Sequence, residues 1–214
     1  MTLKATDEQY KPAIETILDF FNQTAIKKKI QFFIDERSNG FEKWVQFELL
    51  NYMVTEDQKI KSAEIEKPFS LNSNKMDKEK AFIDLVYQKR NQSKEFLHAV
   101  ELKVRIKTTG AIKGAINDIY RLRHIPKPIF KFRSITAVAI FNSDNGEDGK
   151  YLSFIDDLDK AKRVKVHKIS LKNKYKLLVI SWGVPPKLAA RSSFDEFVSD
   201  IKIAAKEHGI RLKG

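Results

Sequence analysis

Two apolar segments joined by a short polar stretch constrain the fold of this chain more than any other feature of its sequence. Residues 81–87 (AFIDLVY) and 96–104 (FLHAVELKV) are rich in aliphatic, β-branched and aromatic residues, a composition typical of strands. The polar residues 89–93 between them favour a turn. The sequence therefore predicts a hairpin of two largely buried strands. Asp84 interrupts the first strand, and Glu101 and Lys103 interrupt the second.

The segments around this hairpin predict an α/β fold. Apolar residues at helical spacing favour helices at 7–23, 41–53, 110–123, 151–159 and 194–207, and apolar runs favour strands at 62–67, 135–141, 163–169 and 175–183. Ser193 and Glu196 have the spacing of a capping box, so the last helix is expected to begin there. We expect one domain, with a core at 41–142, an N-terminal helical extension at 1–39 and a C-terminal elaboration at 143–214.

Composition limits the classes of function. The chain has no cysteine, which excludes disulfides, thiolate zinc sites and a cysteine nucleophile. No apolar run reaches the roughly 20 residues that span a bilayer. We therefore expect no membrane partner, and we expect a cytoplasmic location. The net charge is +12, with nine basic residues and one acid in 103–133 and eight basic residues and no acid in 160–176. Such blocks suit a polyanion, although solvated faces in a lysine-rich protein are the alternative.

Three side chains of the hairpin point to a metal site. Residues two apart on a strand share a face, so Glu101 and Lys103 are expected side by side while Val100 and Leu102 point into apolar packing. Asp84 is costly in an apolar strand unless it is paired or binds a cation; an exposed position on a one-sided strand is the alternative. Two carboxylates and a lysine on adjacent strands would form an oxygen-rich site that suits Mg²⁺.

Glu48 is a fourth candidate. On a helix over 41–53, the apolar side chains of Phe41, Trp44, Val45, Leu49 and Tyr52 form one face, and Glu48 falls within it. An ionised residue in an apolar stripe needs a partner, so we expect Glu48 to face the same site. In the alternative, Phe47 and Leu50 define the buried face and Glu48 lies at its edge.

The order of these elements and residues resembles the PD-(D/E)XK nuclease superfamily, which has the restriction-endonuclease-like fold. The likeness covers about 41–142, and Ile83 stands where the name-giving proline would be. The resemblance implies a central mixed β-sheet flanked by helices in the order αβββαβ. It also implies that Asp84 and Glu101 bind one or two Mg²⁺ ions, for which Mn²⁺ substitutes, and that Lys103 activates the attacking water. Glu48 would be an auxiliary metal ligand or a support for the site, and the products would carry 5′-phosphate and 3′-hydroxyl ends.

Residues after the second strand are expected to hold the substrate. Lys107, Lys113, Asn117 and Arg121 follow the E-x-K sequence, and the last three lie on or near the polar face of the helix at 110–123. Their expected role is contact with the DNA backbone, and a solvated helix face is the alternative. Asp118 is expected to form an ion pair with Arg121 or Lys113.

The expected function is therefore Mg²⁺-dependent hydrolysis of DNA phosphodiester bonds, as in a restriction-type endonuclease, with DNA as partner and a homodimer possible. Two alternatives stay open: a non-catalytic nucleic-acid-binding protein with a nuclease-like fold, and a nuclease directed at RNA. Neither H-E-x-x-H nor a phosphate-binding glycine loop is present, so zinc peptidase and nucleotide-hydrolase activities are not expected.

Overall fold

The structure is a computed structural model that describes residues 7–36, 41–71, 80–92, 96–142, 149–171, 175–184 and 190–212. Within these ranges, the side chains of 7–13, 106–109 and 142 are not described. Ser93, the last residue of the expected turn, lies outside the described residues, as does part of the expected N-terminal extension. The backbones of all the candidate site residues lie inside them.

A six-stranded mixed sheet forms the centre of the molecule, with the strand order β1-β2-β3-β4-β6-β5. β3 and β4 are parallel neighbours, and every other neighbouring pair is antiparallel. The parallel pair is joined by a crossover that contains α4, as parallel neighbours require. The strands are β1 (Ile60–Ser70), β2 (Lys80–Lys89), β3 (Leu97–Lys107), β4 (Phe132–Asn142), β5 (Lys165–Ser170) and β6 (Tyr175–Gly183).

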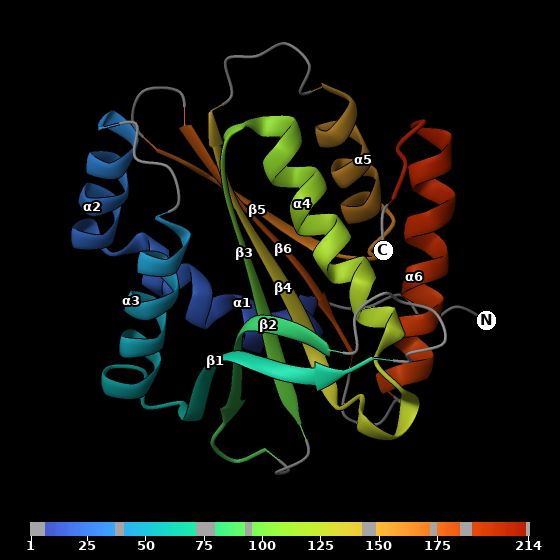
Figure 1. Cartoon of the computed structure of the whole chain (residues 1–214), viewed down its shortest axis with the longest axis horizontal. Coiled ribbons are helices and arrows are strands. Elements are labelled where there is room, and N and C mark those ends of the chain that lie inside the picture. Colours follow the sequence, from blue (N-terminus) through green and yellow to red (C-terminus); the bar gives the residue numbers. More distant parts are fainter. Residues whose placement is uncertain are drawn as a thin grey trace.

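Helices cover both faces of the sheet (Figure 1). α4, α5 and α6 pack on one face, where their buried residues join those of the sheet in one hydrophobic core. α1, α2 and α3 pack on the opposite face around a second core. The helices are α1 (Asp7–Asn22), α2 (Thr24–Asp35), α3 (Glu42–Thr55), α4 (Thr108–Arg121), α5 (Gly149–Lys160) and α6 (Ala190–Glu207), with short 3-10 turns η2 (Leu122–His124) and η3 (Lys127–Ile129).

Alternation along β3 and β4 explains why two cores form. Ala99 on β3 and Ala137 on β4 belong to the core under α4, whereas Val100 and Val138 belong to the core under α3. Because successive side chains of a strand point to opposite faces, a strand between two helical layers needs apolar residues at both parities. Glu101 shares the parity of Ala99, so it faces the α4 layer.

The α/β class and the hairpin of β2 and β3 are confirmed, since β2 and β3 are antiparallel with Leu85 opposite Val100. Three expectations need correction. α2 is a second helix of the N-terminal extension, for which only 7–23 was expected to be helical, and β1 extends beyond the expected 62–67. The capping box is wrong, because α6 begins at Ala190 and Ser193 lies inside the helix. Among the described residues, no helix has the length and apolar character needed to cross a membrane.

The β1–β2 hairpin bends where Asp84 lies. Glu66 on β1 has a φ of 51°, a left-handed conformation that is uncommon for residues other than glycine. The pairs on either side are Ile65 with Leu85 and Lys67 with Ile83, so Glu66 stands across from Asp84. Beyond the bend, Ile83 joins the core under α4, whereas Leu85 belongs to the core under α3. The side-chain alternation of β2 is therefore interrupted at Asp84, because Ile83 and Leu85, two residues apart, face opposite helical layers.

Candidate active site

Asp84 lies at the point where β2 separates from β3. The last backbone pair of these strands before Asp84 is Leu85 with Val100. Beyond it, the Asp84 side chain, and not the backbone of β2, binds β3. Its Oδ2 accepts a hydrogen bond from the backbone N–H of Leu102, at 2.7 Å. Burial raises the pKa of Asp84 above its ordinary value, against the effect of this hydrogen bond and of Lys103. A carboxyl group is thus fixed at the free edge of β3.

Glu101 is adjacent to Asp84 and is 1% exposed. The two carboxyl groups are close enough for Asp84 to raise the pKa of Glu101. Burial, followed by the nearby Asp84 and Asp118, raises the pKa of Glu101 well above its ordinary value. Two carboxylates at such short range repel each other, and burial penalises their charged forms. Burial and this repulsion therefore both favour the protonated form of Glu101.

Lys103 projects from the same face of β3 and is held by acids from two helices. Its Nζ lies 2.8 Å from Oδ2 of Asp118 on α4 and 3.9 Å from Oε1 of Glu42 on α3. Burial lowers the pKa of Lys103, but these two acids outweigh burial and raise the pKa above its ordinary value. The ammonium group is therefore charged and sits beside the Asp84–Glu101 pair.

Arg121 closes the cluster from the end of α4. Its Nη2 lies 4.0 Å from Oε1 of Glu101 and 3.8 Å from Oδ1 of Asp118. The expected pairing of Asp118 with Arg121 is therefore present, and a closer pairing of Asp118 with Lys103 accompanies it. Arg121 faces the carboxyl cluster as well as solvent, because 32% of its side chain is exposed.

The α3 glutamate that reaches this cluster is Glu42, and not the expected Glu48. Its Oε2 accepts a hydrogen bond from the backbone N–H of Val104 at 3.0 Å and lies 3.6 Å from Nη1 of Arg105. Glu42 thus binds the edge of β3 that β2 has left. A glutamate at the start of a helix has no apolar stripe around it, so the criterion that selected Glu48 could not select Glu42.

Glu48 contacts a different part of the molecule. Its Oε1 accepts hydrogen bonds from Nε1 of Trp44 at 3.1 Å and from Nζ of Lys29 on α2 at 3.3 Å. Helix α3 covers the face of the sheet opposite to Glu101, with Val45 and Leu49 buried in that core. The structure therefore brings Asp84, Glu101 and Lys103 together and leaves Glu48 in contact with α2.

The four residues expected to hold nucleic acid lie on or just before α4. Lys113 and Asn117 are half-buried on this helix, and Arg121 follows one turn after Asn117. Lys107 is the last residue of β3, opposite Asn142, but its side chain lies outside the described part. The three described side chains accordingly belong to the helix that also carries Asp118.

The donor set of this cluster fits a hard divalent cation. Oε1 of Glu101 is buried and accepts no hydrogen bond from the described residues, and Asp84 supplies a second carboxyl group next to it. Within the described ranges, no group of three or more His, Cys, Asp or Glu side chains is arranged to hold a metal. Two carboxylates are nevertheless a usual protein contribution to Mg²⁺, which keeps several of its waters and also binds substrate phosphate. The residues present fit such an ion.

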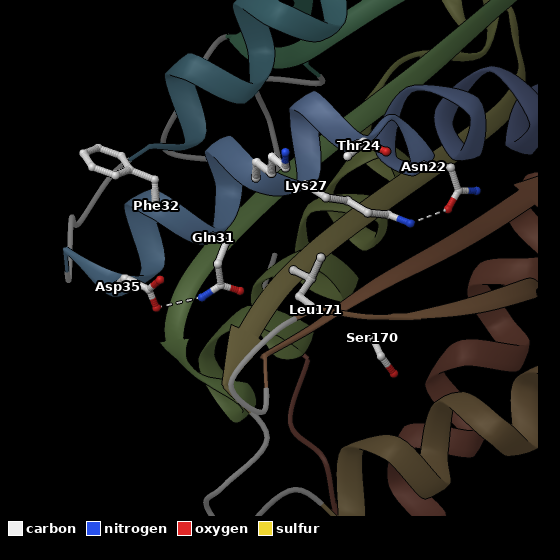
Figure 2. A pocket seen from close by; sticks show the side chains of 9 residues that line it. Asn22, Thr24, Lys27, Gln31, Phe32, Asp35, Ser170 and Leu171 are labelled. Carbon is white, nitrogen blue, oxygen red and sulfur yellow. Dashed lines mark hydrogen bonds between the residues drawn. The ribbon is translucent and has the colours of Figure 1, made fainter.

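A separate groove lies between α2 and the end of β5. It has a volume of about 580 Å³ and is lined by α2 residues, including Lys27, Gln31 and Phe32, and by Ser170 and Leu171 (Figure 2). The groove shares no lining residue with the carboxyl cluster. Its acid, Asp35, accepts a hydrogen bond from Gln31 at 2.7 Å. The lining residues of this groove thus lack the paired carboxyl groups that give the cluster its chemistry.

Comparison with known proteins adds no family to these observations, since no family model, curated protein or solved structure matches the chain.

Proposed function

We propose that this protein is a Mg²⁺-dependent endonuclease that hydrolyses DNA phosphodiester bonds, with Asp84, Glu101 and Lys103 as its active-site residues. One observation carries the proposal: the buried carboxyl group of Glu101 and the half-buried carboxyl group of Asp84, from adjacent strands, lie beside a charged lysine at the free edge of β3. The resemblance of the sequence to the PD-(D/E)XK nucleases is consistent with this arrangement. DNA as the preferred substrate, over RNA, is part of the proposal.

The residues of the chain have distinct tasks in such a reaction. Asp84 and Glu101 would hold the ion through their carboxylate oxygens. When bound, Mg²⁺ supplies an acidified water and withdraws charge from a phosphate oxygen. Lys103 presents a fixed ammonium group that orients the nucleophile and offsets the charge that develops on the phosphate. Arg121 supplies a second positive charge beside Glu101.

The charge distribution supports a nucleic-acid substrate. The net charge is +12. Two basic residues, Lys113 and Arg121, lie on α4, the helix whose Asp118 binds Lys103. Positive side chains near a phosphate-cleaving site attract the polyanion and release its counterions. Lys113 and Asn117 would contact the DNA backbone, whereas Glu48, which binds Lys29 and Trp44, would act on the site only through the position of α3.

The test is cleavage of supercoiled plasmid DNA with Mg²⁺ or Mn²⁺, followed by gel electrophoresis. We expect the wild type to nick or linearise the plasmid, and EDTA to stop it. D84N and K103A should lower the rate by at least about 100-fold, because each removes a group that acts on the transition state. Asp156 pairs with Lys168 on the exposed side of α5, so D156N is the matched control for a lost carboxylate and should cut like the wild type.

The outcomes separate the alternatives. No cleavage of plasmid, single-stranded DNA or RNA by the wild type, with salt-sensitive DNA binding retained in D84N, would indicate a non-catalytic nucleic-acid-binding protein. Cleavage of RNA alone would retain the chemistry and reject the DNA substrate. Full activity of D84N would refute the assignment of the site.

A further inference from the structure

Gly114 lies in the middle of α4, where glycine is the least favourable residue apart from proline. Its backbone does not require glycine, because Gly209 is the glycine with positive φ among the described residues. The space beside it explains the residue. A Cβ at position 114 would lie 3.1 Å from Cδ, 3.3 Å from Cγ and 3.4 Å from Cε of Lys103. The missing side chain of Gly114 thus leaves room for the stem of Lys103.

The stem of Lys103 has little freedom to move aside. Its backbone is paired with Ala139 of β4, and its Nζ is held 2.8 Å from Oδ2 of Asp118. Asp118 lies four residues after Gly114, so both residues occupy the same face of α4. The helix therefore contacts the lysine twice, once along the aliphatic stem and once at the ammonium group.

We propose that Gly114 and Asp118 form a cradle on α4 that fixes the position of the Lys103 ammonium group beside Asp84 and Glu101. Gly114 receives the stem, Asp118 binds the charge, and both are positioning residues, since they act through Lys103. The catalytic part of this inference rests on the proposed nuclease function; the packing part does not. A fixed ammonium group needs no reordering when substrate binds, and small displacements of such a group are costly for the rate.

A pair of glycines on one helix gives a matched test. A Cβ at Gly110 would meet only Cγ and Cβ of Arg105, at 3.8 and 3.9 Å, which is ordinary contact. We expect G110A to raise the urea midpoint of unfolding, because alanine favours the helix. G114A should not raise the midpoint, because its Cβ presses on a stem that is anchored at both ends.

Removal of the stem completes a double-mutant cycle. In the K103A background, G114A should stabilise the fold, because the atoms at 3.1–3.4 Å are gone. The cradle is overturned if G114A stabilises the wild type as much as it stabilises K103A. If K103A does not fold, G114A and G110A are compared in the wild-type background. Equal stabilisation by the two substitutions would reject the cradle.

Kinetics test the catalytic part on a plasmid substrate. G114A and D118N should each lower kcat at least about tenfold with KM within about twofold of the wild type, and G110A should change neither. An unchanged kcat in G114A would reject the positioning role. If the wild type cuts no nucleic acid, the proposed function fails, while the stability cycle still tests the packing of Lys103 against Gly114.

Discussion

Buried polar side chains outside the carboxyl cluster also link the fold to pH, and His98 is the clearest case. Its Nε2–H donates to Oε1 of Gln92 at 2.8 Å, and its Nδ1 lies 2.7 Å from Oγ of Ser134. The imidazole stacks on Tyr87. Burial, aided by the charge of Lys89, lowers the pKa of His98 to about 3. The ring is therefore neutral throughout the ordinary pH range.

This shift predicts that acid destabilises the fold. Between about pH 6.5 and pH 3, an unfolded chain binds a proton at His98 that the folded chain does not, so stability falls as pH falls through this window. From about pH 7 to pH 5 the loss from this one group is about 2 kcal/mol. The contribution of His98 is the difference between the wild type and H98Q in urea unfolding at the two pH values, because the raised pKa values of Asp84 and Glu101 change stability in the opposite direction. The H98Q variant should show a smaller loss, and an equal loss in both proteins would contradict the assignment.

Residue types and local spacing were enough to predict three members of the cluster. Asp84, Glu101 and Lys103 stand out because they interrupt strands, and strand alternation together with a short turn brings them together. Glu42 and Gly114 could not be found in this way. Their roles depend on where α3 and α4 cross the sheet, which is set by packing between residues far apart in the sequence.

At the scale of elements, the bend of the β1–β2 hairpin offers a paired prediction. Glu66 and Glu64 are both exposed on β1, and each forms an ion pair, with Lys43 and Lys67 respectively. Of the two, Glu66 alone has positive φ. E66G should therefore stabilise the fold by up to about 1 kcal/mol, because glycine adopts this conformation without strain.

The matched variant E64G should destabilise the fold by about 0.5–1 kcal/mol, as expected for glycine within a strand. Both free energies of unfolding come from urea denaturation monitored by circular dichroism. Destabilisation of similar size in both variants would mean that the ion pairs, and not the backbone at Glu66, dominate.

The two glutamates of α3 give a second prediction at this scale. E42A leaves the N–H of Val104 without its side-chain acceptor and removes an acid beside Lys103. We expect a loss of about 1–3 kcal/mol in stability and a cleavage rate at least about tenfold lower. Glu48 is more exposed and binds Lys29 and Trp44, so E48A should cost less than about 1 kcal/mol and retain cleavage.

Thermal or urea unfolding and the plasmid assay measure these effects. Loss of cleavage in E48A with normal cleavage in E42A would restore the metal-supporting role that the sequence predicted for Glu48. The prediction failed to find Glu42 because an apolar stripe shows which face of a helix is buried, and it does not show which face of the sheet the helix covers.

For the whole molecule, the net charge of +12 predicts salt-dependent binding of DNA. Without divalent cations, the logarithm of the affinity should fall linearly with the logarithm of the salt concentration, with a slope of about −0.9 for each phosphate contact. Lys113 on α4 and Lys202 on α6 are a useful pair, since both lie on helices of the same layer.

Fluorescence anisotropy with a labelled duplex measures the slope. K113A should reduce the magnitude of the slope by about 0.9, the value for one phosphate contact, and K202A should leave the slope unchanged. Equal effects of the two substitutions would place the DNA elsewhere than along α4.

The global arrangement was the part that sequence could predict only coarsely. Periodicity and apolar runs indicated an α/β protein, and the six-stranded mixed sheet between two helical layers agrees with that class. The strand order β4-β6-β5 and the place of α2 follow from contacts between distant segments. No local pattern encodes such contacts, because many arrangements bury the same apolar faces.

The crossover between the parallel strands β3 and β4 places most of the carboxyl cluster in one continuous stretch of the chain. Glu101, Lys103, Gly114, Asp118 and Arg121 all lie within β3 and α4, two consecutive elements of the chain. Lys103 and the α4 residues that surround it therefore lie in one uninterrupted segment of the chain, 101–121.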